Sequence, residues 1–338
     1  MRQVWITRRG GPNVLRVKEA ADPAPSPGQV RVRVAAAGVN FADILARMGL
    51  YPDAPKLPCV IGYEVAGTVD AIGAGVKSVK AGDRVLALTR FGGYSDVIVA
   101  PELQVVPIPA ALTMEKAAAV PVNYVTAWIM LVKLGNLCKG ERVLIHAAAG
   151  GVGQAALQLC RWRGAEVFGT AGVGKHQRLT ELGVAHCIDY HTQDFEDEVR
   201  RLTDGKGVHL IIDAVGGGSF RKSYRSLAPM GRLFLFGASA LAPGRTRNLF
   251  AAVRGLLAMG AFRPVPLMND NRGVFGVNMG HLWDHAAMLR TIIEEILTLI
   301  AGGVLDPLVD KTFSFDQAAD AHAYLQGRKN FGKVLLTP

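Results

Sequence analysis

The sequence predicts an α/β protein of two domains, one mainly β and the other built on a doubly wound parallel sheet. Its 338 residues exceed the roughly 250–300 residues at which a single hydrophobic core stops growing. Before Pro121, glycine and proline separate short apolar runs, which is typical of antiparallel strands. After Pro121, strand-like apolar runs alternate with helical stretches, which is the pattern of repeated βα units.

The mainly β domain is predicted from four runs. Residues 29–39 begin with strict alternation of apolar and polar side chains, which indicates a strand with one buried face. Three shorter runs follow at 65–69, 83–88 and 94–99, each bounded by glycine or proline. We therefore expect an antiparallel, mainly β lobe at the start of the chain.

The second domain is predicted from strands at 142–147, 166–170, 210–214 and 231–236 with helical sequence between them. A helix is expected over 286–301, where apolar side chains recur at helical spacing. It leads to a short β and α tail, which we expect to return to the first lobe. The predicted domains are therefore 1–121 with 285–338, and 122–284.

Composition narrows the class of protein. No stretch approaches the roughly 20 apolar residues of a membrane span, and the N-terminus lacks the pattern of a signal peptide. The four cysteines are far apart, which suits a reducing compartment, so a cytoplasmic location is expected. The net charge of +10 is concentrated in 221–272, which holds nine basic residues and one acid. An anionic partner is indicated, but no aromatic-basic motif favours nucleic acid.

A glycine-rich turn at 148–153 lies between an apolar strand and an apolar helix. Small residues allow a backbone to approach a pyrophosphate, and the helix N-terminus presents N–H groups and a positive dipole end to it. Ala148 stands where the usual motif has its first glycine. The context predicts a dinucleotide-binding domain.

The residues at the end of the next predicted strand distinguish between NAD and NADP as the cofactor. NAD requires an acidic side chain there to bind the ribose 2′-hydroxyl, but residues 165–171 end without one. Lys175 and Arg178 are the next charged residues, and a lysine attracts the 2′-phosphate of NADP. We therefore predict NADPH as the cofactor, with a solvated Lys175 at a helix start as the alternative interpretation.

The chain resembles the medium-chain dehydrogenase/reductase superfamily over essentially its whole length. The motifs that carry this resemblance are residues 36–43, 57–67 and 148–153. Within it the chain resembles the zinc-free quinone oxidoreductases, and most closely the branch related to the synaptic-vesicle amine-transport protein. Residues 188–191, the insertion 237–272 and the ending 329–336 carry that closer likeness. The resemblance implies a GroES-like catalytic domain, a Rossmann domain and a homodimer.

The resemblance also implies that no metal is bound. Zinc-dependent relatives carry cysteine where Asn40 stands and histidine where Tyr63 stands, and neither an amide nor a phenol is a normal zinc ligand. Quinones and conjugated carbonyls are then the favoured acceptors of hydride. The catalytic residues carried over are Asn40, Tyr51 and Tyr63, each of which also fits a purely structural role. Asp43 is expected to cap a helix at the surface.

The cofactor-binding residues come partly from the loop and partly from the resemblance. Phe236 and Gly237 are placed there because ligands bind outside the carboxyl ends of such strands, and Val277 is expected to approach the nicotinamide through its backbone. The full predicted set is Ala149, Gly150, Gly151, Val152, Gly153, Thr170, Lys175, Tyr190, Phe236, Gly237, Val277, Asn330 and Lys333.

Segment 241–272 supports a competing interpretation. It mixes arginines with large apolar side chains, which suits a helix lying on an anionic membrane. The chain would then be a vesicle- or lipid-associated protein that keeps the nucleotide fold with little turnover. The other interpretation is a lip of the substrate cleft or a dimer contact.

Overall fold

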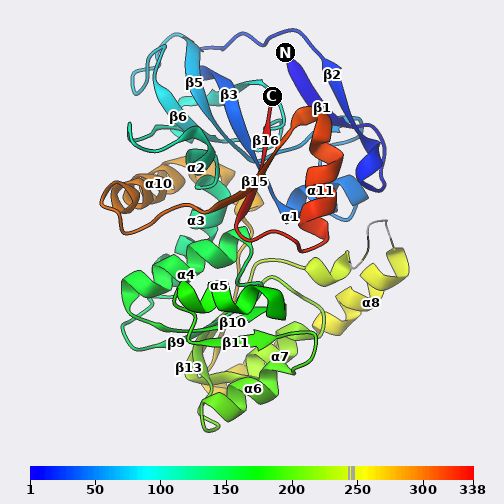
Figure 1. Ribbon diagram of the computed structural model, residues 1–338, viewed down its shortest axis with the longest axis vertical. Coiled ribbons are helices and arrows are strands. Elements are labelled where there is room, and N and C mark those ends of the chain that lie inside the picture. The colour runs from blue at the N-terminus through cyan, green and yellow to red at the C-terminus, as the bar shows by residue number, and fades with distance from the viewer. Residues whose placement is uncertain (243, 245–247) are drawn as a thin grey trace. The chain divides into compact units, whose positions relative to one another are not determined.

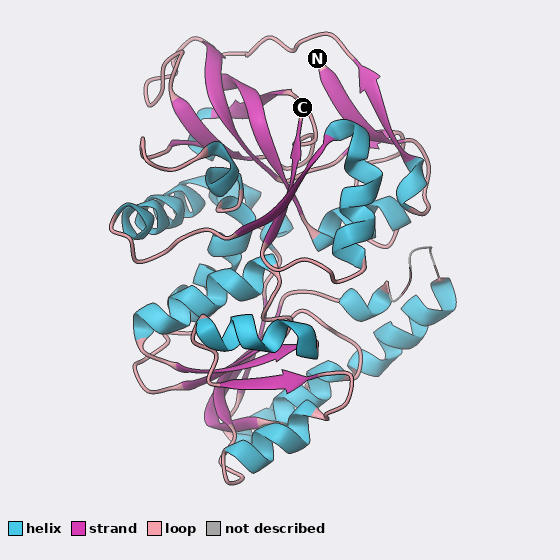
Figure 2. Cartoon of the chain, in the orientation of Figure 1, coloured by secondary structure: helices cyan, strands magenta, loops and turns pink. Residues whose placement is uncertain are grey.

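A computed structural model describes residues 1–242, 244 and 248–338 (Figure 1). The chain forms two compact units. Unit 1 comprises Met1–Val125, residue 244 and Met279–Pro338, and unit 2 comprises residues 126–242 and 248–278. Strands dominate unit 1, whereas helices and strands alternate in unit 2 (Figure 2). The mixed α/β class predicted from the sequence is confirmed.

Unit 1 is built on two sheets. The larger has the strand order β15-β16-β3-β5-β6-β8, with β7 also paired to β3, and the smaller has the order β2-β1-β4. The strands are β1 (Arg2–Ile6), β2 (Leu15–Glu19), β3 (Gln29–Val39), β4 (Cys59–Val60), β5 (Glu64–Ile72), β6 (Arg84–Leu88), β7 (Val97–Pro101), β8 (Val105–Pro107), β15 (Val309–Ser314) and β16 (Lys333–Thr337).

The alternation in β3 determines how this strand is buried. Val30 and Val32 are fully buried in the apolar core of unit 1. The intervening Arg31 and Arg33 point away, and both pair with Asp70 of β5, at 2.8 and 3.0 Å. One face of the strand therefore contributes to the core, as its sequence pattern predicts.

The end of the chain joins the same sheet. Strand β16 pairs antiparallel with β3, with Val334 opposite Val39, and parallel with β15. The helices of this part of the chain are α1 (Phe41–Met48), α2 (Met114–Ala118), α3 (Pro121–Trp128), α10 (Ala286–Ala301) and α11 (Ala318–Gln326). Short turns of 3-10 helix are η1 (Pro12–Val14), η2 (Glu102–Gln104), η6 (Met279–His281), η7 (Trp283–His285) and η8 (Phe315–Gln317).

Unit 2 is a parallel sheet with the strand order β11-β10-β9-β12-β13-β14. The order reverses between β9 and β12, which is the switch point of a doubly wound fold, where ligands bind beyond the carboxyl ends of the strands. The strands are β9 (Arg142–Ile145), β10 (Glu166–Ala171), β11 (His186–Asp189), β12 (Val208–Asp213), β13 (Leu227–Leu235) and β14 (Gly273–Gly276).

Helical segments precede and connect these strands. They are the π-helical turn η3 (Ile129–Lys133), α4 (Gly151–Arg163), η4 (Val173–Lys175), α5 (His176–Glu181), α6 (Phe195–Leu202), α7 (Ser219–Arg225), η5 (Ser239–Leu241), α8 (Leu249–Met259) and α9 (Pro264–Asp270). None of the helices in the described ranges is long and apolar enough to span a bilayer.

Most strand boundaries differ from the sequence prediction by a few residues, and two of the differences have a clear cause. The strand expected at 231–236 begins four residues earlier, because Leu227 continues the ladder with Val208 of β12 across a register shift. The strand expected at 94–99 begins only at Val97, since Tyr94 is instead held by main-chain bonds to Val4 and Ile61. The arginines at 245 and 247, part of the predicted basic segment, lie outside the described residues.

Candidate active site

The turn between β9 and α4 is tight. Ala147 has a φ of +53°, and Gly150 stands in an extended conformation as the N-cap of α4, without a side-chain cap. A Cβ atom added to Gly153 would lie 2.4 Å from the Ala147 carbonyl oxygen, so only glycine lets the helix start so close to the turn. The first N–H groups of α4 have no partner within the helix and are therefore available to an anion.

A buried polar network lies against this turn. The Ala147 N–H donates to Thr170 Oγ1 at 3.2 Å, and the Ala148 N–H donates to the Thr170 carbonyl at 3.1 Å. Thr170, predicted to bind cofactor, is thus bonded to the turn itself. Burial lowers the pKa of His146, whose ring lies 3.2 Å from Thr170 Oγ1 and 3.1 Å from Ser223 Oγ. Ser223 Oγ in turn donates to Asp213 at 2.7 Å, which fixes the arrangement.

Lys175 and Tyr190 follow neighbouring strands. Lys175 closes η4 after β10, and Tyr190 follows β11 directly. Because β10 and β11 are parallel, with Ala171 opposite Asp189, both residues come after the same edge of the sheet. Asp189, at the end of β11, is engaged locally, since it accepts from the His191 N–H at 3.1 Å and from Thr192 Oγ1 at 3.0 Å.

The later predicted positions also follow strand ends. Phe236 and Gly237 come directly after β13, and a Cβ on Gly237 would press against the backbone of Ala214 at 3.0–3.1 Å. Val277 follows β14, and its N–H donates to the Leu235 carbonyl at 2.9 Å. The structure therefore places these residues at the carboxyl ends of β13 and β14.

Unit 1 holds a second group of predicted residues, in a buried polar cluster. The Lys333 ammonium donates to Asn40 Oδ1 at 2.7 Å and is ion-paired with Glu64. Asn40 Nδ2 donates at 2.9 Å to Glu64 Oε1, which is also the oxygen paired with Lys333. The Val122 N–H donates to the other carboxylate oxygen, Oε2, at 2.6 Å. Glu64 is fully buried and Lys333 is 2% exposed, so each charge depends on the other.

The sheet explains why these three residues meet. Asn40 follows β3, Glu64 begins β5 and Lys333 begins β16, and β3 pairs with both of the other strands. Room for the carboxylate comes from Gly38, because a Cβ there would lie 2.3 Å from Glu64 Oε1. Asn330, also buried, is turned to the Gly332 carbonyl, to which its amide donates at 2.9 Å.

Tyr51 and Tyr63, the other two predicted catalytic residues, pack against each other in unit 1. Their rings meet edge to face, with centroids 6.4 Å apart, and Tyr63 also packs on Phe91 at 5.3 Å. The Tyr63 hydroxyl is buried and has no hydrogen-bond partner of normal geometry among the described residues. Burial raises the pKa of Tyr63 well above its usual value, and the nearby Asp43 and Tyr51 reinforce this shift.

Sequence reasoning missed several members of the site. Glu64, which is neutralised by Lys333, was not among the predicted site residues. Asp43 does cap α1, since it accepts from the Asn40 N–H at 2.8 Å, but it is fully buried and not at the surface as expected. Its partner Tyr94 and the buried His322 carried no local motif, because they come from segments far apart in the chain.

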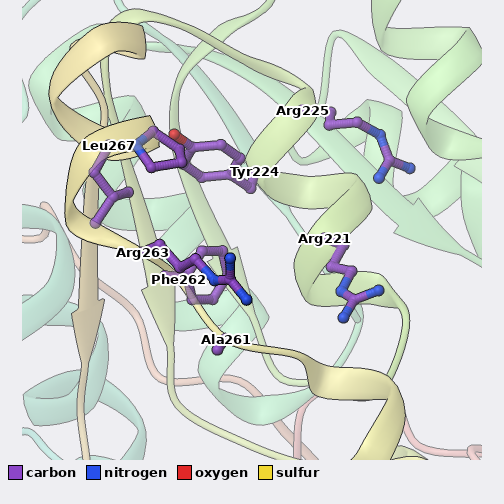
Figure 3. Close-up of a pocket in the computed structure, with 8 residues that line it drawn as sticks. Arg221, Tyr224, Arg225, Ala261, Phe262, Arg263 and Leu267 are labelled. Carbon is purple, nitrogen blue, oxygen red and sulfur yellow. The ribbon is translucent and has the colours of Figure 1, made fainter.

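A surface pocket of about 230 Å³ lies elsewhere in unit 2. Figure 3 shows Arg221 and Arg225 of α7 together with Tyr224, Phe262 and Arg263 around it. None of the predicted catalytic or cofactor-binding residues lines this pocket. It belongs instead to the basic segment noted in the sequence.

Comparison with known proteins identifies the family. Residues 26–110 match the alcohol dehydrogenase GroES-like domain, and residues 182–336 match the zinc-binding dehydrogenase domain. The chain is 42% identical to the human synaptic vesicle membrane protein VAT-1 homolog over all of its own length and 86% of that protein.

Among the solved structures that resemble the chain over nearly all of its length are two reductases. The Escherichia coli quinone oxidoreductase complexed with NADPH has a TM-score of 0.89 and 31% identity, with 100% of each chain covered. The CurK enoyl reductase has a TM-score of 0.86 and 29% identity, with 99% of this chain and 98% of that one covered. The chain therefore belongs to the medium-chain dehydrogenase/reductase superfamily and, within it, to the family of the VAT-1 homologues.

Proposed function

We propose that the protein is an NADPH-dependent oxidoreductase that transfers hydride to a quinone or a related conjugated carbonyl compound. The observation that carries the proposal is the turn at 147–153, which is shaped for a pyrophosphate at the start of α4. The NADPH complex of the similar quinone oxidoreductase supports the choice of cofactor.

The residues present fit this cofactor. The main chain of Ala149–Gly153 would hold the bridging phosphates, because a Cβ at Gly153 would close the turn and the glycines leave the helix start bare. Lys175 and Tyr190 would receive the adenosine phosphate at the edge formed by β10 and β11. Thr170 would act by holding the turn, while Phe236, Gly237, Val277 and Asn330 complete the proposed contacts.

We also propose that turnover needs no zinc, although the matching domain model bears a zinc-binding name. The donor set does not fit the metal, because neither the amide of Asn40 nor the phenol of Tyr63 is a normal zinc ligand, and Glu64 already accepts a hydrogen bond from Asn40. Lys333 already neutralises Glu64, and its ammonium group also donates a hydrogen bond to Asn40. A cation at this position would meet an ammonium group, so no reaction step is assigned to a metal.

The choice of acceptor follows from this chemistry. The nicotinamide, when bound, supplies a hydride. Without a Lewis acid, the protein favours acceptors that delocalise the resulting charge themselves, as quinones and enones do. Asn40, Tyr51 and Tyr63 would orient the carbonyl and donate hydrogen bonds to the oxyanion, with Asn40 held in place by Lys333 and Glu64. The similarity to an enoyl reductase supports the conjugated class.

Three further features predicted from the sequence belong to the proposal. The domain extents are 1–121 with 285–338, and 122–284. The protein is proposed to act as a homodimer and in the cytoplasm. These features do not affect the chemistry above.

The exposed apolar face of α8 supports a second candidate function, which is binding to an anionic membrane. Phe250 is 80% exposed and Leu257 is 75% exposed, and the exposed Arg254 lies between them in the helix. The pocket beside α7 adds Arg221 and Arg263, whereas Arg225 is already paired with Glu196 at 2.7 Å. Exposed apolar side chains with arginines nearby suit the surface of an anionic membrane.

One paired experiment decides between the two functions. The protein is offered NADPH with quinones, enones and simple aldehydes in parallel, and it is floated with neutral and with anionic liposomes. We expect NADPH oxidation with quinones or enones, with little oxidation in the presence of aldehydes. Flotation that requires anionic lipid, without NADPH oxidation on any acceptor, would instead establish the membrane function and overturn the reductase.

Exchange of Lys175 for glutamate tests the preference for NADPH. We expect its Kd for NADPH to rise by roughly 10–100-fold, because a charge-assisted contact worth about 1.5–3 kcal/mol becomes a repulsion. The Kd for NADH should change much less. The matched control is Lys206→Glu, an exposed lysine of the same unit, and both affinities are measured by fluorescence titration. Equal losses for the two nucleotides would contradict contact with the 2′-phosphate.

A further inference from the structure

Asp213 is a fully buried acid at the carboxyl end of β12. Its Oδ1 accepts from the main-chain N–H groups of Val215 at 2.8 Å and of Gly216 at 3.4 Å. Its Oδ2 accepts from the hydroxyls of Ser219 and Ser223, both at 2.7 Å. Four donors from the loop after β12 and from α7 therefore converge on one carboxylate.

The hydroxyl of Ser223 determines the tautomer of His146. Ser223 has one hydroxyl proton, which it donates to Asp213, so its oxygen can only accept from the ring nitrogen Nε2 of His146 at 3.1 Å. Burial lowers the pKa of His146, which keeps the ring neutral at neutral pH. The ring proton is then on Nε2, and Nδ1 is left as an acceptor.

The hydrogen bonds continue from His146 to the turn between β9 and α4. His146 Nδ1 lies 3.2 Å from Thr170 Oγ1, so the Thr170 hydroxyl donates to it. Thr170 Oγ1 in turn accepts from the Ala147 N–H, also at 3.2 Å. Asp213, Ser223, His146 and Thr170 thus form one network, the Asp213 network. All of its hydrogen bonds from Ala147 to Asp213 point the same way, so the buried carboxylate polarises each of them.

The residue that this network holds, Ala147, has an unfavourable backbone conformation. Its φ of +53° lies in the left-handed region, which an alanine adopts only where the surrounding structure holds it there. Its carbonyl oxygen accepts from the Gly150 N–H at 2.8 Å, and its own N–H is fixed by Thr170. The Asp213 network therefore sets the geometry of the turn from which α4 begins.

The network also spans the switch point of the sheet. His146 directly follows β9 and Thr170 lies in β10, whereas Asp213 ends β12, on the other side of the reversal in strand order. Asp213 thus holds two segments that follow strand ends, the turn after β9 and the loop after β12. In a doubly wound fold the ligand binds at this point, beyond the carboxyl ends of the strands.

From this geometry we infer that Asp213, Ser223 and His146 are positioning residues for the dinucleotide, acting through Thr170 on the main chain of the turn that would hold the bridging phosphates. The inference rests on the proposed function. NADPH and NADH carry the same bridging phosphates, so the Asp213 network affects the binding of both nucleotides by the same factor. In this respect it differs from Lys175, whose proposed contact is with the 2′-phosphate of NADPH alone.

Four variants test this role by fluorescence titration with NADPH and with NADH. Thr170→Val should raise both Kd values by about 10-fold, because the Ala147 N–H loses its acceptor. Ser223→Ala breaks the network farther from the turn and should raise both by about 3–5-fold. Thr170→Ser restores the hydroxyl and should recover most of the loss. The matched control is Ser226→Ala, whose hydroxyl donates to the Lys222 carbonyl outside the network, and both Kd values should stay unchanged.

The wild type allows a further test that needs no substitution. Nitrogen NMR of the imidazole rings, assigned through the neighbouring main chain, should show His146 with a protonated Nε2 and a bare Nδ1 at neutral pH. A protonated Nδ1, or unchanged affinities in both Thr170→Val and Ser223→Ala, would overturn the inference alone. An equal loss in Ser226→Ala, or a loss confined to NADPH, would do the same. Absence of NADPH binding by the wild type would refute the proposed function as well.

Discussion

Replacement of Lys333 by methionine is expected to lower the free energy of unfolding by about 3–5 kcal/mol at neutral pH. The reason is that Glu64 is fully buried and would lose the ammonium that neutralises it, keeping only hydrogen bonds from Asn40 and Val122. A buried carboxylate without a counter-charge is among the costliest changes a core can suffer. Denaturant unfolding monitored by circular dichroism measures the effect.

Two further variants show that the charge causes the loss. The double variant Lys333→Met with Glu64→Gln should recover much of the stability, because it leaves no buried charge behind. Lys116→Met breaks an ion pair with Asp306 at the exposed surface and should cost less than about 1 kcal/mol. If Lys333→Met lowered the free energy of unfolding as little as Lys116→Met does, the proposed stabilising role of the Lys333–Glu64 pair would be disproved.

Exchange of Gly150 for valine is expected to weaken NADPH binding by ~100-fold or more. The added side chain would stand at the N-cap of α4 and block the approach of a phosphate to its N–H groups, where two lost charge-assisted bonds account for about 3–6 kcal/mol. The change should spare the fold, since the φ of −77° and ψ of 174° suit valine. The Cβ itself meets only the Ala147 oxygen, at 3.3 Å.

Gly302→Val is the matched control. Gly302 follows α10 with a φ of −79°, and a Cβ there would make ordinary contacts at 3.5 Å or more. Its affinity for NADPH should equal that of the wild type, while thermal unfolding confirms that both variants are folded. Normal NADPH affinity in Gly150→Val would show that the phosphates bind elsewhere.

Much of the fold could be predicted because its signals are local. The alternation in β3 and the strand–turn–helix sequence around Gly150 each place an element directly. The edge strands β11 and β14 were not predicted, since neither contains an apolar run like that of β9 and β14 begins and ends with glycine. Their pairing comes from the neighbouring strands, which only the folded sheet supplies.

The candidate site likewise has one part that the sequence reveals and another that only the folded structure reveals. The phosphate turn is contiguous in sequence, so its residue types reveal it. The buried pair of Glu64 and Lys333 spans 269 positions and depends on two strands meeting β3. Lys333 was predicted as a cofactor-binding residue through family resemblance, and its contact with Glu64 and Asn40 emerges only from the sheet. Asp43 was expected at the surface because one residue pattern serves both exposed and buried helix caps.

Amide hydrogen exchange with and without NADPH tests the central claim most directly, because it reports on the main chain that is proposed to hold the phosphates. The account predicts saturable binding with slower exchange at the N–H groups of residues 149–153, at the start of α4. Binding that leaves these amides unchanged, or no binding at any NADPH concentration, would contradict it.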